Sequence, residues 1–178
     1  MRPNELVQLE KEGSEEEGTH MKPLHIVWQR LINAEGQTCD RCGATYDGLQ
    51  RATAKLKAAL SPLGVEPTLE TKEIDERAFK ADPSASNRLW IADRPLEEWL
   101  GGTTGSSRCC SVCGESDCRT IEVGGTVFEA IPEELILKAA LIAAAQMLAP
   151  SSAALSGQRE HDSENPRCCG RQIADSTT

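Results

Sequence analysis

The chain has 178 residues, 39% of them hydrophobic, which is enough for the core of one domain. Its net charge of −9, without any sustained basic cluster, excludes nucleic acid as a partner, because phosphate binding needs a basic surface. The longest apolar run, residues 135–148, is interrupted by Lys138 and is shorter than the roughly 20 residues that span a bilayer. We therefore expect no membrane contact.

The first residues lack the basic start and apolar stretch of a signal peptide, so we expect a cytoplasmic protein. Residues 1–21 are acidic and are predicted to be disordered. Residues 22–148 hold every segment that is typical of a folded domain. Residues 149–178 are rich in Ser, Gly, Gln and charged side chains and are predicted to be a disordered tail. The sequence leaves the oligomeric state open.

The first half of the domain predicts a strand–helix–strand unit. Residues 23–33 are rich in Ile, Val, Leu and Trp and indicate a strand. Apolar residues then recur at helical spacing over residues 40–61, and Pro62 and Gly64 end that helix. Residues 65–74 predict a second strand.

The middle of the domain is less regular. Residues 75–86 are polar and predict a loop with a short helix, and residues 87–92 predict a short strand. Residues 95–100 (PLEEWL) fit either a fourth strand or a short helix with Pro95 in its first turn. The adjacent glutamates Glu97 and Glu98 in this segment are predicted to lie on a solvated face.

The last part of the domain predicts a hairpin and a helix. Residues 101–107 are Gly-, Thr- and Ser-rich and predict a flexible loop. Residues 120–130 predict a hairpin that turns at two consecutive glycines. Residues 132–148 predict a helix with two glutamates near its N-terminus.

Cysteine is the most unusual residue type in this chain. Eight cysteines form three groups: Cys39 and Cys42; Cys109, Cys110, Cys113 and Cys118; and Cys168 and Cys169. Because cytoplasmic thiols are kept reduced, such groups indicate metal binding or thiol catalysis before they indicate structural disulfides.

The first pair lies where a predicted strand gives way to a predicted helix. Free N–H groups and partial positive charge at a helix N-terminus stabilise a thiolate. The spacing of three lets Cys39 act as nucleophile, or as first metal ligand, with Cys42 as the resolving partner. Arg41 between them adds positive charge.

This motif, residues 38–43 (TCDRCG) after a strand, resembles that of the thioredoxin-like superfamily. More closely, the chain is similar to an uncharacterised prokaryotic family of cysteine-rich thioredoxin-like domains that has no assigned activity. The matching stretches lie within residues 23–148 and are 27–31 (VWQRL), 86–91 (SNRLWI), 95–100 (PLEEWL) and 109–114 (CCSVCG).

The resemblance implies an α/β, thioredoxin-like fold: a mixed sheet of about four to five strands flanked by helices, with a cysteine-rich loop. Two features depart from the thioredoxin pattern. Thr38 replaces the usual Trp before the first cysteine, and Ser86 and Asn87 are expected where the family's cis-proline would lie. Loss of that proline leaves metal binding open at the first pair.

The second group places four thiols, Cys109, Cys110, Cys113 and Cys118, within ten residues and without a nearby histidine. An all-sulfur site favours zinc, cadmium, mercury, copper(I) or arsenite over hard cations. The alternative is a structural zinc that only fixes a loop. If residues 95–100 form the fourth strand, this loop emerges beside Cys39 and Cys42, and six thiols converge.

The third group, Cys168 and Cys169, is similar to the mobile vicinal pair that hands metal to the buried site of mercuric reductases. Two adjacent thiols can bind one large soft ion. The alternative is an accidental pair on a disordered tail.

Together these observations predict a cytoplasmic thiol protein. It binds or transfers a soft metal or metalloid ion of the zinc, mercury or arsenic class, or it performs thiol–disulfide exchange with a protein partner. No organic cofactor is expected. The alternative is a non-catalytic, zinc-stabilised module that binds another protein.

Overall fold

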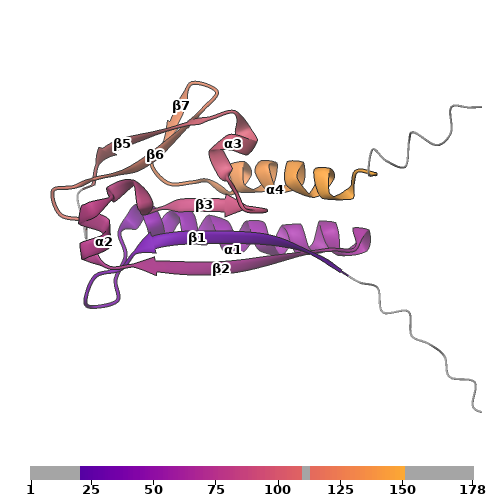
Figure 1. Ribbon diagram of the computed structural model, residues 1–178, viewed down its shortest axis with the longest axis horizontal. Helices are drawn as coiled ribbons and strands as arrows, with labels where there is room; N and C mark the ends of the chain where they lie inside the picture. Colours follow the sequence, from indigo (N-terminus) through magenta and orange to yellow (C-terminus); the bar gives the residue numbers. More distant parts are fainter. Residues whose placement is uncertain (1–20, 110–112, 151–178) are drawn as a thin grey trace, which may run out of the picture. The chain divides into compact units, whose positions relative to one another are not determined.

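The computed structural model describes residues 21–109 and 113–150, which form a mixed α/β domain (Figure 1). The strands are β1 (Lys22–Leu31), β2 (Val65–Ile74), β3 (Arg88–Ile91), β4 (Arg94–Pro95), β5 (Thr103–Arg108), β6 (Asp117–Val123) and β7 (Thr126–Phe128). The helices are α1 (Asp40–Leu60), α2 (Glu76–Ala81), α3 (Leu96–Leu100) and α4 (Glu133–Leu148), with the 3-10 helices η1 (Ser61–Leu63) and η2 (Pro83–Ala85).

The first sheet has the strand order β2-β1-β3-β4. β1 and β2 run parallel over ten residues, and α1 provides the crossover that a parallel pair requires. β3 runs antiparallel to β1, and β4 adds only two residues beside β3. The sheet is therefore mixed, as predicted.

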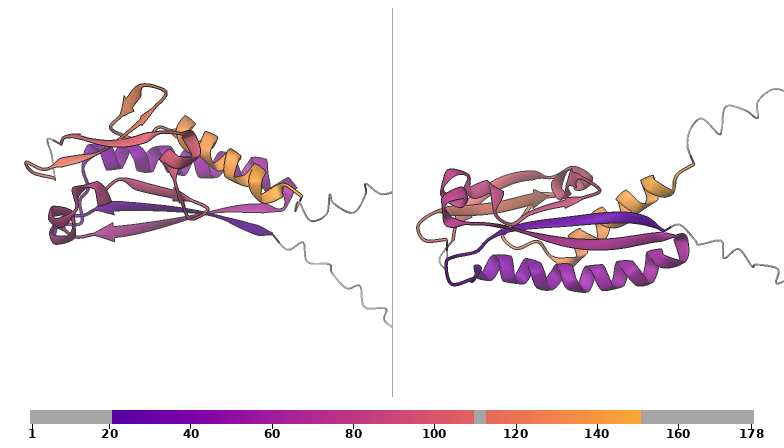
Figure 2. Two further views of the ribbon diagram at one scale, coloured as in Figure 1. Left: turned by 45° about the horizontal axis from the view of Figure 1, so that its top comes forward. Right: turned by 60° about the horizontal axis from the view of Figure 1, so that its bottom comes forward.

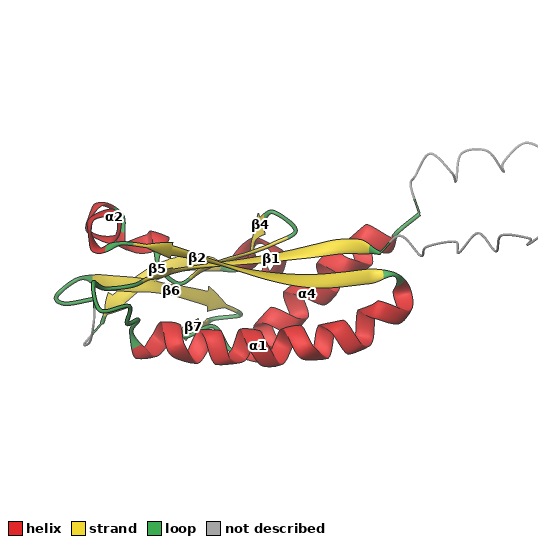
Figure 3. Ribbon diagram, turned by 90° about the horizontal axis from the view of Figure 1, so that it is seen from below, coloured by secondary structure: helices red, strands yellow, loops and turns green. Residues whose placement is uncertain are grey.

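The core lies between this sheet and the helices on one of its faces. Alternate residues of β1, namely Leu24, Ile26 and Trp28, are fully buried, whereas His25 between them is exposed. Figure 3 shows α1 and α4 on the same side of the sheet. The Leu and Ala side chains of these helices complete the core, which explains how a chain with so few aromatics fills it.

The second sheet has the order β5-β6-β7 and is entirely antiparallel. Figure 2 shows it beyond β3, on the side away from β2. Gly124 and Gly125, with φ of 60° and 78°, form the tight turn between β6 and β7. Gly102 precedes β5 where a Cβ atom would lie only 2.5 Å from the carbonyl oxygen of Glu122, so only glycine fits there.

Most predicted elements are confirmed: the helix over Asp40–Leu60, the strand over Val65–Ile74, the glycine hairpin and the last helix. The flexible loop predicted for residues 101–107 is wrong, because Thr103–Arg108 pairs with β6 as strand β5. For residues 95–100 the helical alternative is right. Pro95 is the N-cap of α3, and only Arg94 and Pro95 pair with β3.

The solvated face predicted for the two glutamates is wrong for Glu97. Its side chain is 11% exposed and forms an ion pair with Arg119 of β6, which is 5% exposed. Arg119 also donates to the carbonyl oxygen of Ser84 at 3.5 Å. This buried pair ties α3 to the second sheet. Glu98 is exposed, as predicted, and pairs with Arg94 at 3.4 Å.

The predicted segments 1–21 and 149–178 fall almost wholly outside the described residues. Among the helices that are described, none has the length and apolar character needed to cross a membrane.

Replacing Glu97 with glutamine keeps the shape of the side chain but removes the counter-charge of Arg119. We expect Glu97→Gln to lower the free energy of unfolding by about 3–5 kcal/mol, the usual cost of removing one partner of a buried pair. The matched control is Glu98→Gln, because its exposed ion pair is worth less than about 1 kcal/mol. Urea denaturation measures both, and equal losses would contradict this role of Glu97.

Candidate metal centre

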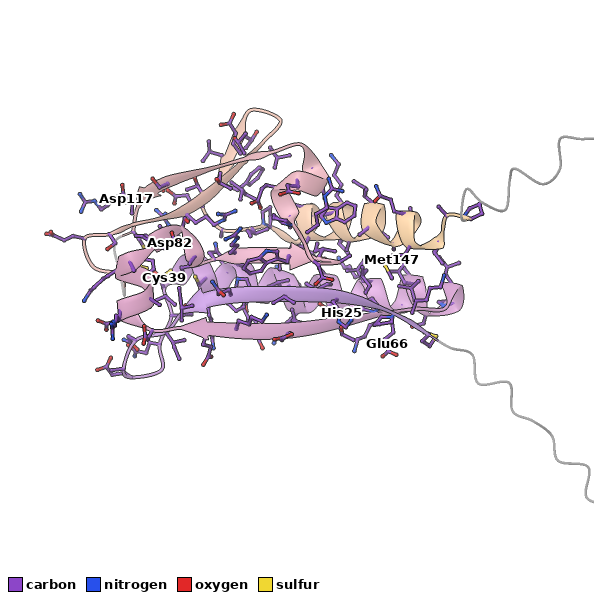
Figure 4. All side chains as sticks on the ribbon, in the orientation of Figure 1. His25, Cys39, Glu66, Asp82, Asp117 and Met147 are labelled. Atoms are coloured by element: carbon purple, nitrogen blue, oxygen red, sulfur yellow. The ribbon has the colours of Figure 1, made fainter. Side chains whose placement is uncertain are left out.

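The first cysteine pair lies at the N-terminus of α1. The hydroxyl of Thr38 donates to the carbonyl oxygen of Leu31 at 2.9 Å and holds the loop against the end of β1. Cys39 is the N-cap residue, with extended backbone (φ −75°, ψ 162°), and its carbonyl oxygen accepts the first helical hydrogen bond from Gly43 at 2.9 Å. Cys42 lies one turn further along. Figure 4 shows Cys39 at the end of α1 that lies near α2.

The second group lies at the turn between β5 and β6. Cys109 directly follows β5, and Cys118 is the second residue of β6, where it pairs with Ser107. The backbone N–H of Cys109 donates to the carbonyl oxygen of Ser116, and that of Ser116 donates to the carbonyl oxygen of Cys113. The end of the ladder and these two hydrogen bonds thus hold Cys109, Cys113 and Cys118 in one turn.

The two groups meet in the folded chain. The Sγ atoms of Cys39, Cys109 and Cys113 all lie within 4.8 Å of one another, so they can hold a metal ion. The Cys118 thiol lies near all three of these residues, although its sulfur does not belong to the set that lies within 4.8 Å of one another. Four sulfurs around a zinc ion with Zn–S distances of about 2.3 Å lie about 3.8 Å apart. The sulfurs of Cys39, Cys109 and Cys113 are therefore within roughly one ångström of the spacing that a single ion requires.

Every described cysteine of this cluster is buried and none is in a disulfide: Cys39 is 3% exposed, Cys42 1%, Cys109 3%, Cys113 6% and Cys118 4%. Burial of this many polarizable thiols in one place is not needed to fill a core that already contains Leu, Ile and Ala. The arrangement is typical of a closed, all-sulfur metal site.

Cys42 is also in contact with Ser86. The hydroxyl oxygen of Ser86 lies 3.7 Å from the Sγ atom of Cys42 and accepts a hydrogen bond from the backbone N–H of Leu31 at 3.1 Å. The segment before β3 therefore lies against the cysteine pair.

The cluster stabilises one thiolate, that of Cys39. Hydrogen bonds from Cys118 and then Cys42 hold the pKa of Cys39 far below its usual value, against the opposing effect of burial. The same hydrogen bonds to Cys39, together with burial, raise the pKa of Cys118 and of Cys42. Burial is the main cause that raises the pKa of Cys113 to about 12. A thiolate at Cys39 agrees with the sequence prediction, although neighbouring thiols contribute more than the helix terminus.

Arg41 joins the two cysteine groups. Its guanidinium donates to the hydroxyl of Ser107 at 2.9 Å, to the Ser107 carbonyl oxygen at 3.3 Å and to the carbonyl oxygen of Arg108 at 2.6 Å. It also forms an ion pair with Glu129 at 2.9 Å. Ser107 and Arg108 directly precede Cys109, so the Arg41 side chain fixes the distance to the second group. The sequence suggested only an added positive charge at this position.

Of the six thiols that were predicted to converge, the structure brings Cys39, Cys42, Cys109, Cys113 and Cys118 together. The predicted route is wrong, because β5 rather than a fourth strand over residues 95–100 carries the second group to this place. Cys110 lies outside the described residues, and so do Cys168 and Cys169.

The fold and the cluster define a mixed α/β domain whose buried cysteines can hold a metal ion. The chain belongs to the family described as Domain of unknown function (DUF2703), whose model matches residues 24–140. An uncharacterized protein of Archaeoglobus fulgidus is 41% identical over 113 residues, which make up 64% of this chain and 82% of that protein. These matches confirm the predicted uncharacterised family. No solved structure matches the chain.

Arg41 offers a direct test of how the two groups are held together. Arg41→Gln removes charge-assisted hydrogen bonds worth about 1.5–3 kcal/mol, so local opening at Cys109 becomes roughly ten- to a hundred-fold more frequent. We expect alkylation of Cys109 by iodoacetamide to accelerate by this factor, as measured by peptide mass spectrometry. Arg51→Gln is the control, because Arg51 is exposed and its ion pair is with Glu133 of α4. An unchanged rate in Arg41→Gln would contradict the role of Arg41.

Proposed function

We propose that this domain is a thiol protein of thioredoxin-like fold that binds one soft metal ion. Cys39, Cys109 and Cys113 are the first three ligands in this proposal, and Cys118 is the fourth. The observation that carries the proposal is the approach of three sulfurs, from segments about 70 residues apart, to within 4.8 Å of one another.

The order of the strands supports the thioredoxin-like part of the proposal. In that fold a parallel β1–α1–β2 unit is followed by an antiparallel β3–β4 pair, and the last helix covers the same face as the first. The order β2-β1-β3-β4 and the common side of α1 and α4 agree with it. So do the cysteine pair at the N-terminus of α1 and the contact of Ser86 with Cys42.

The chemistry of the donors supports a soft ion. The cluster offers only sulfur, which favours zinc and other thiophilic metals over magnesium or calcium. Four thiolates suit Zn(II), and three suit As(III). Several buried thiolates repel one another unless a cation neutralises them, so full ionisation of this cluster requires a bound ion.

The low exposure of the sulfurs favours a closed site over an open catalytic one. Because α1 and the second sheet both supply ligands, a bound ion links two parts of the fold. The same observation favours the alternative in which zinc stabilises a non-catalytic module that binds another protein. If the protein transfers the ion rather than only holding it, a partner must supply or receive that ion.

One observation favours thiol–disulfide exchange as a second function: the Cys39 thiolate at a helix N-terminus contacts the Cys42 thiol three residues on. In such a reaction the Cys39 sulfur attacks a partner's disulfide and releases one partner thiolate. Cys42 then loses its proton, attacks the mixed disulfide and releases the second partner thiolate. The 3% exposure of Cys39 makes this function second to metal binding.

Metal titration tests the first proposal. Full-length protein, purified reduced and without chelator, is expected to bind one Zn(II) or Co(II) ion per chain, with a thiolate-to-cobalt absorption band. Cys109→Ser and Cys113→Ser are expected to lose tight binding, whereas Cys42→Ser keeps it. At about a thousand times Kd the ion stabilises the fold by about 4 kcal/mol and raises Tm by about 10 °C.

The double variant Cys168→Ser/Cys169→Ser is the control for the tail. If this variant binds one ion per chain, the proposed site is supported. If it does not bind, Cys168 and Cys169 are the ligands and the proposed site is wrong. Absence of binding to the wild-type protein, or unchanged binding by Cys109→Ser, would contradict the proposal.

Reduction of insulin disulfides by the metal-free protein tests the second function. We expect Cys39→Ser to abolish this activity and Cys42→Ser to trap a mixed disulfide with the substrate, because the resolving thiol is missing. The double variant Cys168→Ser/Cys169→Ser is the control, since both residues lie outside the pair. Equal activity of wild type and Cys39→Ser would exclude thiol–disulfide exchange at this pair.

A further inference from the structure

Cys42 is the buried thiol that the proposed metal site does not use. It is 1% exposed and, like Cys118, lies outside the three sulfurs that are within 4.8 Å of one another. Cys118 interacts with all three of those residues, whereas the interaction of Cys42 within the cluster is with Cys39. The Cys42 thiol thus contacts the first proposed ligand. A sulfur held beside a metal ligand, but outside the ligand set, requires an explanation of its own.

Hydrogen bonds hold Cys42 in this place. The backbone N–H of Leu31 donates to the hydroxyl oxygen of Ser86, which leaves the hydroxyl hydrogen of Ser86 available to the Cys42 sulfur at 3.7 Å. The Cys42 thiol in turn reaches Cys39. This series of contacts runs from β1 through the start of β3 to the edge of the cluster, so the position of Cys42 is fixed by the first sheet.

The distance between Cys39 and Cys42 suits a disulfide. The hydrogen bond from Gly43 to Cys39 shows that the first turn of α1 is regular. Helical geometry separates the Cα atoms of residues three apart by about 5 Å. Disulfides span Cα separations of about 4.4–6.8 Å, so the pair can close without movement of the backbone.

Cys39 therefore belongs to two thiol sets, the metal ligands and the Cys39–Cys42 pair. Its sulfur cannot serve both at once, because a disulfide sulfur carries no negative charge for a metal ion. Closure of the pair leaves Cys109, Cys113 and Cys118 without the thiolate that the cluster stabilises most strongly.

We propose, on the basis of the metal site proposed above, that hydrogen peroxide oxidises Cys39 and Cys42 to a disulfide and thereby releases the bound ion. The Cys39 sulfur attacks peroxide, the O–O bond breaks, and Cys39 becomes a sulfenic acid, whose bond to the ion breaks only when Cys42 displaces the sulfenic oxygen. The departing hydroxide takes one proton from solvent and leaves as water. The Cys42 sulfur then forms the S–S bond, and its proton leaves with the sulfenic oxygen as a second water.

The two sulfurs together lose two electrons, and peroxide gains them. A dithiol reductant returns the two electrons and restores both thiols, so the ion can bind again. The reduced protein holds the ion, and the oxidised protein has the Cys39–Cys42 disulfide and no ion. The fraction of protein that holds the ion therefore falls when an oxidant is present.

The test uses full-length protein loaded with Zn(II). One equivalent of hydrogen peroxide is added, the released ion is followed with a chromogenic chelator, and disulfides are mapped by mass spectrometry. We expect one ion per chain to leave as the Cys39–Cys42 disulfide forms, and dithiothreitol to restore binding. Cys42→Ser is expected to bind the ion but to release it at least about ten-fold more slowly, because the resolving thiol is gone.

Cys168→Ser/Cys169→Ser is the matched control and is expected to release the ion like the wild type. Release from Cys42→Ser at the wild-type rate, or a disulfide from Cys39 to any other cysteine, would overturn the switch and leave the metal site standing. Failure of the wild-type protein to bind an ion would overturn both. If Cys42→Ser does not fold, the wild-type protein decides, because release must then follow the same time course as formation of the Cys39–Cys42 peptide.

Discussion

The candidate site depends on the contact that Arg41 makes across the molecule. Its guanidinium binds two backbone carbonyl groups 66 and 67 residues away, and these directly precede Cys109. The thiols of the two groups lie in one buried core cluster. Arg41, one of the two residues between Cys39 and Cys42, adds the polar contact that fixes the end of β5 against the N-terminus of α1.

Much of the β1–α1–β2 unit could be predicted from the sequence, since the apolar residues of α1 recur at helical spacing and Pro62 and Gly64 separate this helix from β2. The sequence of β5 carries no such signal. Its Thr, Gly and Ser residues are largely exposed, and the strand exists because β6 supplies its hydrogen bonds. Glu97 was misjudged for a related reason, because the partner that allows its burial, Arg119, lies on a distant strand.

The convergence of the cysteines was predictable in part. A thiol pair at a strand–helix junction and a thiol-rich loop are visible as patterns, and their meeting follows from the order of the strands. The role of Arg41 was not predictable, because its partners are mainly backbone carbonyl groups and a glutamate, Glu129, more than 80 residues away. Every residue has a backbone carbonyl group, so the sequence does not indicate which of them accepts a hydrogen bond. The contact of Cys42 with Ser86 was not predicted, because the two residues are 44 positions apart in the sequence.

Protons and a metal ion can hold the same cluster in different ways. Without an ion, the Cys39 thiolate is stabilised by hydrogen bonds from Cys118, Cys42 and Cys113, so protons on neighbouring sulfurs separate the charges. Ligands must lose their protons to bind a metal, so an ion that enters displaces protons from the ligand sulfurs. Cys42 lies outside the proposed ligand set and keeps its proton. It therefore remains beside the metal-bound Cys39 as a hydrogen-bond donor, which is also the position from which it can form a disulfide.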